Sequence, residues 1–373
     1  MTVTSWTSAR RVVIKVGSAL LVEAATGRLR SDWLAALAKD VHQLQQQDRQ
    51  IIIVTSGAIA LGRNRLGKPQ GRLTLAEKQA AAAIGQITLA QGWAGALHAH
   101  DLGIAQHLVT LADTEDRRRH LNARAAISEV LKAGLIPLIN ENDTVSTAEI
   151  RFGDNDRLGA RVAQMIGADL LVLMSDVDGL YSADPRKDST ATHLPEIPKL
   201  TAEIEAMAGA APVGWSSGGM VTKLAAARIA TGAGCHMLIT DGRQSGALGD
   251  LFSGKSRHSW FHATTSPHSA RKQWIGAAID PAGTLTVDTG AARALTAGKS
   301  LLAAGISAAS GNFHRGDPVL LTGPEGQELG RGLARYGQRD LQQILGRSSD
   351  EITSILGWSD GPVVVHRDDM ALL

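Results

Sequence analysis

Short apolar runs alternate with longer amphipathic segments through most of the chain. The runs are rich in Val, Ile and Leu, as expected of strands that are buried on both faces of a parallel sheet. Between them, apolar residues recur with helical spacing, which predicts helices packed on the sheet. The pattern predicts strands at residues 11–16, 50–54, 104–110, 135–139 and 169–174, and helices at 32–47, 75–97, 113–132 and 224–231. The predicted fold class is α/β, with an open, mostly parallel sheet and helices on both faces.

The pattern changes in the last part of the chain. After residue 280 the segments become short and glycine turns become frequent, as in LTVDTG and GDPVLLTGPEGQELGRGLARYG. This predicts a small β-rich domain of roughly 90 residues. Ser, Thr, His and Pro cluster just before it, together with Trp260 and Trp274. We therefore expect a first domain at residues 1–255, a linker at 256–279 and the β-rich domain at 280–373.

The composition narrows the class of protein. A chain of 373 residues suits two domains, and its formal net charge of +2 argues neither for nor against a nucleic-acid surface. The single cysteine, Cys235, has no partner for an internal disulfide and fits a reducing compartment. No apolar run approaches about 20 residues, and the N-terminal MTVTSWTSARR lacks the apolar core of a signal peptide. The expectation is a soluble cytoplasmic protein.

The most informative stretch is residues 135–167, where two polar clusters bracket a short loop. The first, INEND, follows the predicted strand at 135–139, and the second, GDND, precedes a segment that can form a helix. In α/β sheets, small polar ligands bind beyond the carboxyl ends of the strands. One cluster alone is most simply explained by turns and helix caps. Two clusters contain more amides and carboxylates than capping needs, and so favour a binding site.

Two lysines lie beside glycine-bearing loops. Lys15 is near the end of the first predicted strand, just before Gly17, and Lys223 closes the loop GWSSGGMVTK that leads into the predicted helix at 224–231. Such loops can approach phosphate groups closely, and the lysines would supply charge. Taken alone, Lys15 is as well explained by an edge strand, and glycine-rich helix entries are common. Ser56, at the start of another predicted helix, is most simply an N-cap, although it could also contact an anion.

One nucleotide-binding motif is a false match. Residues 249–256 (GDLFSGKS) formally fit the P-loop pattern, which needs a strand directly before it and a helix directly after it. Here the apolar run at 237–239 ends well upstream, and the following RHSWFHATTSP is not helix-prone. We do not expect a P-loop.

Together these residues suit phosphoryl transfer. Lysines and helix N-termini stabilise the charge on a phosphoryl group in transfer, which is the main help that this reaction needs. The clusters contain no histidine or cysteine to act as a general base. A carboxylate acceptor is already ionised at neutral pH and needs no base. Because acidic residues in the pocket would repel an anion, the acceptor should also carry a cation, as an amino acid does.

Several motifs, in one order along the chain, resemble those of the amino acid kinase family. They are IKVGS, VTSGAIALG, INENDTVST, FGDNDRLGARVA, LMSDVDGLYSADPR and SSGGMVTKLAAARIA. The combination of INEND with FGDND separates the chain from the aspartokinase, uridylate kinase and carbamate kinase members. The resemblance covers roughly residues 11–251, and the tail resembles a PUA domain, as in long-form bacterial members. It implies ATP-dependent phosphorylation of the L-glutamate side-chain carboxylate, the first step of proline biosynthesis, with ATP as co-substrate and Mg²⁺.

The resemblance also implies roles for individual residues. Lys15 and Lys223 would stabilise the phosphoryl group, with Asp156 holding both lysines. The residues implied to bind glutamate are Ser56, Asp143 and Asn155. Those implied to bind ATP are Lys15, Ser175, Asp176, Ser217, Gly218, Gly219, Met220, Val221, Thr222 and Lys223. The family loop usually begins Gly-Thr-Gly-Gly, and Ser216 and Ser217 here replace its first two residues. Serine at the first position lacks the freedom of glycine to adopt positive φ.

The sequence allows alternatives for the metal ligand and for the function. The metal ligand could be Asp154, Asp156 or Asp176. Feedback inhibition by proline and a homo-oligomer, dimer or tetramer, are family expectations only. An alternative is a PUA-type RNA-binding or amino-acid-sensing protein with a kinase-like scaffold, but basic and acidic residues alternate in the tail without an evident RNA-binding stripe. A nearer alternative keeps the kinase and changes the acceptor to another amino acid or acyl group.

Overall fold

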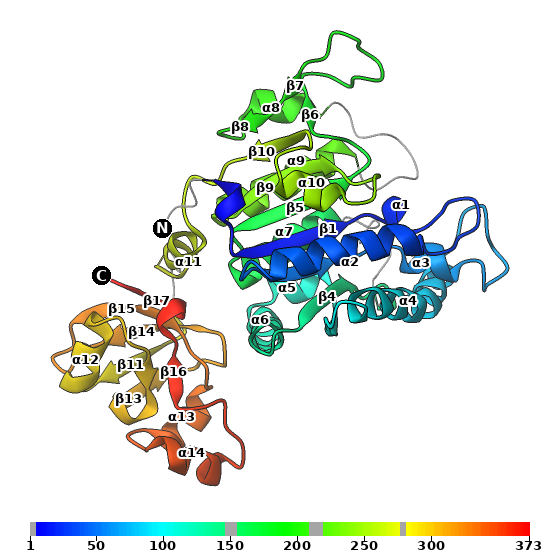
Figure 1. Ribbon diagram of the computed structural model, residues 1–373. Helices are drawn as coiled ribbons and strands as arrows, with labels where there is room; N and C mark the ends of the chain where they lie inside the picture. The colour runs from blue at the N-terminus through cyan, green and yellow to red at the C-terminus, as the bar shows by residue number, and fades with distance from the viewer. Residues whose placement is uncertain (1–4, 146–154, 209–218, 277–280) are drawn as a thin grey trace. The chain divides into compact units, whose positions relative to one another are not determined.

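A computed structural model describes residues 5–145, 155–208, 219–276 and 281–373 (Figure 1). These residues form two compact units. The first contains the chain up to Glu115 together with Asn122–Pro267, and the second contains Asp116–Leu121 and His268–Leu373. No helix in the described ranges is long and apolar enough to cross a membrane.

The first unit is built around one sheet of eight strands. These strands are β1 (Arg11–Val16), β2 (Gln50–Val54), β3 (Ile104–Val109), β4 (Ile136–Glu141), β5 (Leu170–Ser175), β8 (Glu196–Ile197), β9 (His236–Asp241) and β10 (His258–Phe261). Their order is β3-β4-β2-β1-β5-β9-β10-β8. The strands from β3 to β9 in this order are parallel, and β10 is antiparallel to β9. The carboxyl ends of the parallel strands therefore lie at one edge of the sheet.

Helices cover both faces of this sheet (Figure 1). Alternate strand residues enter separate cores, so that Val12 and Ile14 pack on one face and Val13 on the other. The first core also takes residues of α2 (Ser31–Gln45), α4 (Leu75–His98) and α10 (Ala247–Phe252). The second takes residues of α6 (Arg117–Lys132), α7 (Asn155–Ile166) and α9 (Met220–Gly232). The predicted α/β fold class, with a mostly parallel sheet between helices, is confirmed.

The helix predicted at residues 113–132 was wrong as a single element. The structure has α5 (Leu111–Glu115) followed by α6, with Asp116 between them. The Asp116 carboxylate accepts a hydrogen bond of 2.8 Å from the backbone N–H of Arg119, as an N-cap does. A cap inside a helical pattern starts a new helix and ends the earlier one.

Two other boundaries also differ from the prediction. β4 continues through Asn140 and Glu141, whose polar side chains therefore belong to the sheet and not to the following loop. α9 begins at Met220, with Gly219 in extended conformation at its N-cap, so that Lys223 lies in the first turn of the helix. Met220 and Leu224 continue one helical stripe, which explains the earlier start.

The remaining elements of the first unit are short. They are η1 (Trp6–Ser8), α1 (Ser18–Leu21), α3 (Ala58–Gly62), the paired strands β6 (Leu180–Tyr181) and β7 (His193–Leu194), and α8 (Ala202–Ala206). The false P-loop match at residues 249–256 spans the end of α10 and the turn before β10, so that a strand follows it. That order is the reverse of the one that a P-loop needs, and its rejection is confirmed. Residues 256–279, predicted as a linker, contain β10 and α11 (Pro267–Gly276).

The second unit is β-rich. Its sheet has the order β13-β11-β14-β15-β17. Large side chains such as Phe313, Tyr336 and Ile352 fill its core. The strands of this unit are β11 (Gly283–Val287), β12 (Leu301–Leu302), β13 (Ile306–Gly311), β14 (Pro318–Thr322), β15 (Glu328–Leu333), β16 (Val363–Val365) and β17 (Met370–Leu372). Its other helices are α12 (Thr289–Thr296), η2 (Ala303–Gly305), α13 (Gln338–Ile344), α14 (Ser349–Leu356) and η3 (Arg367–Asp369).

Helices α3 and α4 approach closely through glycine. A Cβ atom on Gly85 of α4 would lie 1.8 Å from the carbonyl oxygen of Ala58, and one on Gly62 would lie 1.9 Å from that of Ala81. Both contacts are with backbone, which cannot rotate away. The contact matters for function because α3 follows the loop that carries Ser56.

Replacing Gly85 with alanine should therefore destabilise the protein, by about 3 kcal/mol in the free energy of unfolding, because the added methyl group overpacks the helix contact. Gly95 on the same helix is the matched control, since a Cβ there has nothing within 4 Å. Gly95→Ala should instead stabilise the protein by about 0.5–1 kcal/mol through helix propensity. Urea denaturation of the two variants measures both effects. If Gly85→Ala and Gly95→Ala changed the free energy of unfolding by the same amount, α3 and α4 would not be closely packed at Gly85.

Candidate active site

Lys15 lies inside the sheet, close to the carboxyl end of β1. It is in register with Val54 of β2 on one side and Leu173 of β5 on the other, so the edge-strand explanation is wrong. The residue is only 8% exposed. Helix α7 packs onto its stem at Gly159, where a Cβ would be 3.4 Å from the Lys15 Cβ. A lysine this buried needs a partner for its ammonium group.

That partner is Asp156, in the first turn of α7. Its Oδ1 lies 2.7 Å from Lys15 Nζ, and its Oδ2 lies 3.0 Å from Lys223 Nζ. Lys223 comes from the first turn of α9, and Thr222 beside it donates a hydrogen bond of 3.1 Å to the same Oδ2. The sequence therefore brings β1, α7 and α9 together through one carboxylate.

Lys15, Asp156 and Lys223 form a charged cluster, which is buried and carries a net positive charge. Asp156 is 1% exposed and Lys223 is 4% exposed. Burial opposes ionisation of Asp156, but the ammonium groups of Lys15 and Lys223 outweigh it and hold its pKa well below its usual range. One carboxylate against two ammonium groups leaves one positive charge without a countercharge inside the cluster. Such an arrangement is costly unless an anion binds to it.

A second polar network, the amide network of Ser56, Gln86, Asn140 and Asn155, adjoins the first at the start of α7. Asn155 Nδ2 lies 2.9 Å from the carbonyl oxygen of Thr55 and 2.5 Å from Ser56 Oγ. It also lies 3.3 Å from Asn140 Oδ1, and Asn140 Nδ2 donates to Gln86 Oε1 at 2.8 Å. The structure thus brings together the predicted pair Ser56 and Asn155. The two networks meet because Asn155 and Asp156 are neighbours in the chain.

Asp143 follows β4 and is half-buried. Burial, together with the nearby charge of Glu141, raises its pKa to about 7. At neutral pH the carboxyl group is therefore divided between its two protonation states. A bound cation would favour the ionised form.

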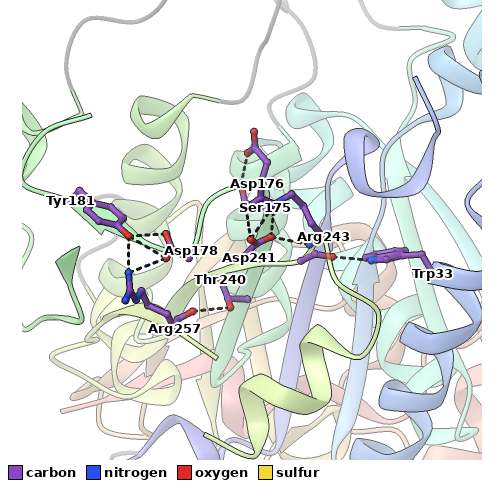
Figure 2. A network of polar contacts seen from close by, with 10 residues as sticks. Trp33, Ser175, Asp176, Asp178, Tyr181, Thr240, Asp241, Arg243 and Arg257 are labelled. Atoms are coloured by element: carbon purple, nitrogen blue, oxygen red, sulfur yellow. Dashed lines mark hydrogen bonds and ion pairs between the residues drawn. The ribbon is translucent and has the colours of Figure 1, made fainter. Parts of the chain in front are cut away.

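Ser175 and Asp176 lie at the carboxyl end of β5 (Figure 2). Ser175 Oγ donates to Asp176 Oδ1 at 3.1 Å, and Ser175 is in register with Asp241 at the end of β9. Arg243 holds Asp241 through two nitrogens, with Nη2 2.6 Å from Oδ2 and Nε 3.0 Å from Oδ1. This pairing lowers the pKa of Asp241, mainly through the hydrogen bonds from Arg243.

The ends of β5 and β9 are linked to neighbouring segments by polar contacts (Figure 2). After β9, Trp33 of α2 donates from Nε1 to the carbonyl oxygen of Gly242 at 2.8 Å, and Thr240 donates to the carbonyl oxygen of Arg257 at 3.1 Å. After β5, Tyr181 donates to Asp178 at 3.1 Å and accepts a hydrogen bond of 3.2 Å from Arg257 Nη1. These contacts hold the ends of β5 and β9 in place.

The predicted site residues fall into four groups, of which Ser175 and Asp176 at the end of β5 are one. Lys15, Asp156, Thr222 and Lys223 meet in the charged cluster, with Gly219, Met220 and Val221 at the start of the same helix. Ser56 and Asn155 meet in the amide network. Asp143 lies after β4, where the charge of Glu141 acts on it. Ser217 and Gly218, with Ser216 and Asp154, lie outside the described residues.

Sequence reasoning missed Gln86 and Arg243. Gln86 lies on the predicted helix at residues 75–97, to which the sequence assigns no site residue. Its one signal was an amide on the buried stripe of that helix, in phase with Ala82 and Leu89. Arg243 had no signal beyond its place after an apolar run.

The site fits a magnesium ion that is carried by nucleotide phosphates. Among the residues that the structure describes, no group of three or more His, Cys, Asp or Glu side chains could hold a metal by itself. Asp156 is engaged with two lysines and Asp241 with Arg243. Asp176 retains a carboxylate oxygen beyond its bond with Ser175. Mg²⁺ usually keeps several waters and needs one or two carboxylates beside phosphate oxygens.

Comparison with known proteins matches almost the whole chain. Residues 10–241 match the model of the amino acid kinase family, and residues 283–356 match that of the PUA domain. Glutamate 5-kinase from Rhodopseudomonas palustris (strain BisB5) is 53% identical over 97% of this chain and 96% of the relative. The enzyme of the same name from Gluconobacter oxydans (strain 621H) is 53% identical over 98% of this chain and 96% of the relative. Among solved structures, UMP kinase from Ureaplasma parvum is 15% identical, with 68% of this chain and 98% of that chain covered and a TM-score of 0.48.

Proposed function

The chain belongs to the amino acid kinase family, and from its likeness to glutamate 5-kinases over nearly its full length we propose that it phosphorylates L-glutamate. It is a kinase that uses ATP. The acceptor is the side-chain carboxylate, and the products are L-glutamyl 5-phosphate and ADP. This reaction is the first step of proline biosynthesis.

One observation supports this reaction above the others. The buried cluster of Lys15, Asp156 and Lys223 has one positive charge in excess, at the edge of the sheet where α/β proteins bind ligands. A phosphoryl group in transfer spreads negative charge over its oxygens and needs fixed positive charge nearby. Because the lysines are already held by Asp156, they need no reorganisation during the reaction.

The transfer itself requires no general base. An oxygen of the glutamate side-chain carboxylate attacks the γ-phosphorus of ATP, and the bond from that phosphorus to the β–γ bridging oxygen breaks. The electron pair leaves with ADP. The acceptor is already ionised at neutral pH, so no proton has to be removed. In this proposal Lys15 and Lys223 bind the oxygens of the moving group, and Asp156 positions both lysines.

We assign glutamate binding to the amide network and Asp143. Ser56 and Asn155 lie next to the charged cluster, because Asn155 and Asp156 are consecutive residues. Their hydroxyl and amide groups suit a carboxylate, and the acidic side chain of Asp143 suits the substrate ammonium. A ligand with both charges matches this combination better than a simple acyl group does.

We assign the nucleotide to the ends of β5 and β9 and to the start of α9. Ser175, Asp176 and the helix start from Gly219 to Lys223 are the described residues of this assignment, and Ser217 and Gly218 complete it in sequence. Asp176 is the carboxylate that would hold a Mg²⁺ ion arriving with the nucleotide. When bound, such an ion neutralises phosphate charge and orients the γ-phosphate.

The pKa of Asp143 gives glutamate binding a pH dependence. Only the ionised carboxylate pairs with the substrate ammonium, and the pKa of the unliganded protein is about 7. Raising the pH from about 6 to about 8 should therefore lower the apparent dissociation constant of glutamate about tenfold. Glutamate itself does not change charge in this range. Isothermal titration calorimetry across this pH range measures the effect.

Asp143→Asn is the control for this prediction. The amide cannot ionise, so its dissociation constant should be higher than that of wild type at pH 8 and nearly constant with pH. A flat profile in wild type, or a sloping one in the variant, would remove Asp143 from ammonium binding. Affinity for ATP should be the same in both proteins at each pH.

The proposed reaction can be tested with hydroxylamine, which converts an acyl phosphate into a coloured hydroxamate. With ATP, Mg²⁺ and L-glutamate, wild-type protein should give a hydroxamate that requires all three. If hydroxamate formed with a different amino acid and not with glutamate, that amino acid would be the acceptor. If ATP is neither bound nor consumed, the alternative of an RNA-binding protein with a kinase-like scaffold would replace the proposal.

Inhibition by proline, self-association and RNA binding by the second unit stay predictions from the sequence. Proline added to the same hydroxamate assay tests the first of them. Light scattering of the purified protein tests the second.

A further inference from the structure

The orientation of the Asn140 amide is fixed by a backbone group. Its Oδ1 lies 2.9 Å from the backbone N–H of Glu141, which can only donate. The oxygen must therefore face Glu141, and the Nδ2 must face the opposite way, toward Gln86 at 2.8 Å. Gln86 in turn must present its oxygen. A backbone donor thus sets the direction of both amides.

The orientation of the Asn155 amide is fixed in the same manner. Its Nδ2 lies 2.9 Å from the backbone carbonyl oxygen of Thr55, which can only accept. The same nitrogen is 2.5 Å from Ser56 Oγ, so Asn155 donates to the serine and not the reverse. The hydroxyl hydrogen of Ser56 consequently remains available to another acceptor. A serine in this state is a donor for an anionic ligand.

Gln86 reaches this network from a helix that is distant in sequence. It is 9% exposed and belongs to the buried residues of α4. Trp93, about two turns further along α4, donates from Nε1 to Thr55 Oγ1 at 3.0 Å. One face of α4 therefore contacts the carboxyl ends of β4 and β2, which carry the two loops of the acceptor site.

The network has unused hydrogen-bonding capacity at both ends. Within the part of the chain that the structure describes, Gln86 Nε2 and Asn155 Oδ1 are buried and have no hydrogen-bond partner. Most buried polar atoms in folded proteins have a hydrogen-bond partner, and a bound ligand is one explanation for those that do not. Both atoms belong to side chains that are at least nine-tenths buried.

We propose that Gln86 is a positioning residue of the acceptor site, which keeps the Ser56 hydroxyl oriented as a donor to a carboxylate of the substrate. It acts through Asn140 and Asn155, and the proposal rests on the proposed function for the identity of the acceptor. Without the Gln86 oxygen, Asn140 Nδ2 becomes a buried donor with no acceptor. Because backbone groups fix which way both asparagine amides face, Asn140 would then shift as a whole toward another acceptor and move its Oδ1 away from Asn155 Nδ2, now 3.3 Å distant. Asn155 would be held less firmly, and so would the Ser56 hydroxyl to which it donates.

The test is steady-state kinetics of Gln86→Met, which keeps the length of the side chain and removes its oxygen. The KM for glutamate should rise about tenfold, the usual effect of one unsatisfied hydrogen bond in a buried site, while the KM for ATP stays within about twofold. Gln91→Met is the matched control, because Gln91 is exposed on the same helix. It should leave both constants unchanged.

A double-mutant cycle with Ser56→Ala tests whether Gln86 acts through the serine. If it does, Gln86→Met should raise the KM for glutamate less than about threefold in the Ser56→Ala background, because the hydroxyl that it orients is already absent. If the two substitutions raised the KM for glutamate by independent factors that multiply in the double variant, the proposal would be overturned. Equal changes in the KM values of glutamate and ATP would also overturn it, because they indicate a general structural role.

A second substitution covers the case in which the methionine variant does not fold. Gln86→Glu keeps an oxygen that accepts from Asn140, and near pH 6 a buried carboxyl group is still largely protonated and adds no charge. Its KM for glutamate should lie within about threefold of wild type at the same pH. A KM raised about tenfold or more would overturn the proposal. If wild type itself gives no glutamate-dependent hydroxamate, the proposed function fails together with the inference, whereas an active wild type with unaffected Gln86 variants overturns the inference alone.

Discussion

Replacing Lys223 with methionine is expected to lower kcat by at least about 10³-fold and to leave the fold intact. The lysine would contact the phosphoryl group most strongly during transfer, so its loss should appear in kcat and much less in the KM for glutamate. The remaining pair, Lys15 and Asp156 at 2.7 Å, is electrically balanced. The variant therefore keeps a satisfied buried carboxylate, and its melting temperature should be close to that of wild type.

Hydroxamate formation measures the loss of activity, and calorimetric unfolding measures the stability. Lys132→Met is the matched control, because Lys132 is 69% exposed and pairs with Glu129 on the surface of α6. It should retain wild-type kcat. If Lys223→Met kept more than about a tenth of wild-type kcat, Lys223 would not be stabilising the transferred group.

The placement of Lys15, Asp156 and Lys223 at one edge of the sheet could be predicted because each is marked locally, whereas the pairing of Asp156 with both lysines was implied by the family resemblance. Lys15 interrupts an apolar run just before a glycine, and Asp156 sits in a polar cluster that opens a helix. Parallel topology then places the strand ends and helix starts at one edge of the sheet without any further information. Each residue taken alone was ambiguous, and only the topology removed the alternative of an edge-strand lysine.

The amide network was not predictable in the same way. Gln86 and Asn140 are 54 positions apart, and their contact depends on how α4 lies beside the end of β4. Sequence periodicity identifies which face of α4 is buried, but not which polar group that face meets. The same limit applies to Arg243, whose role depends on the strand order that places β9 beside β5.

Asp156→Asn is expected to damage both stability and activity, in contrast to Lys223→Met. The amide leaves two buried ammonium groups without a countercharge, which should cost about 3–5 kcal/mol of unfolding free energy. kcat should fall as well, because neither lysine is then held toward the phosphoryl group. Asp184→Asn is the control, since Asp184 pairs with Arg186, which is 82% exposed. It should leave the free energy of unfolding close to that of wild type.

The pH dependence of stability separates loss of charge from loss of packing at Asp156. In wild type the folded-state pKa of Asp156 lies below its ordinary value, so its stabilisation is complete above that value and disappears as the pH falls through the folded-state pKa. In Asp156→Asn this acid-sensitive contribution is absent. The stability deficit of the variant should therefore shrink as the pH falls from about 4 to about 2, because wild type then loses the contribution that the variant already lacks. A deficit that stays constant over this range would show that packing, and not the two buried positive charges, accounts for the loss.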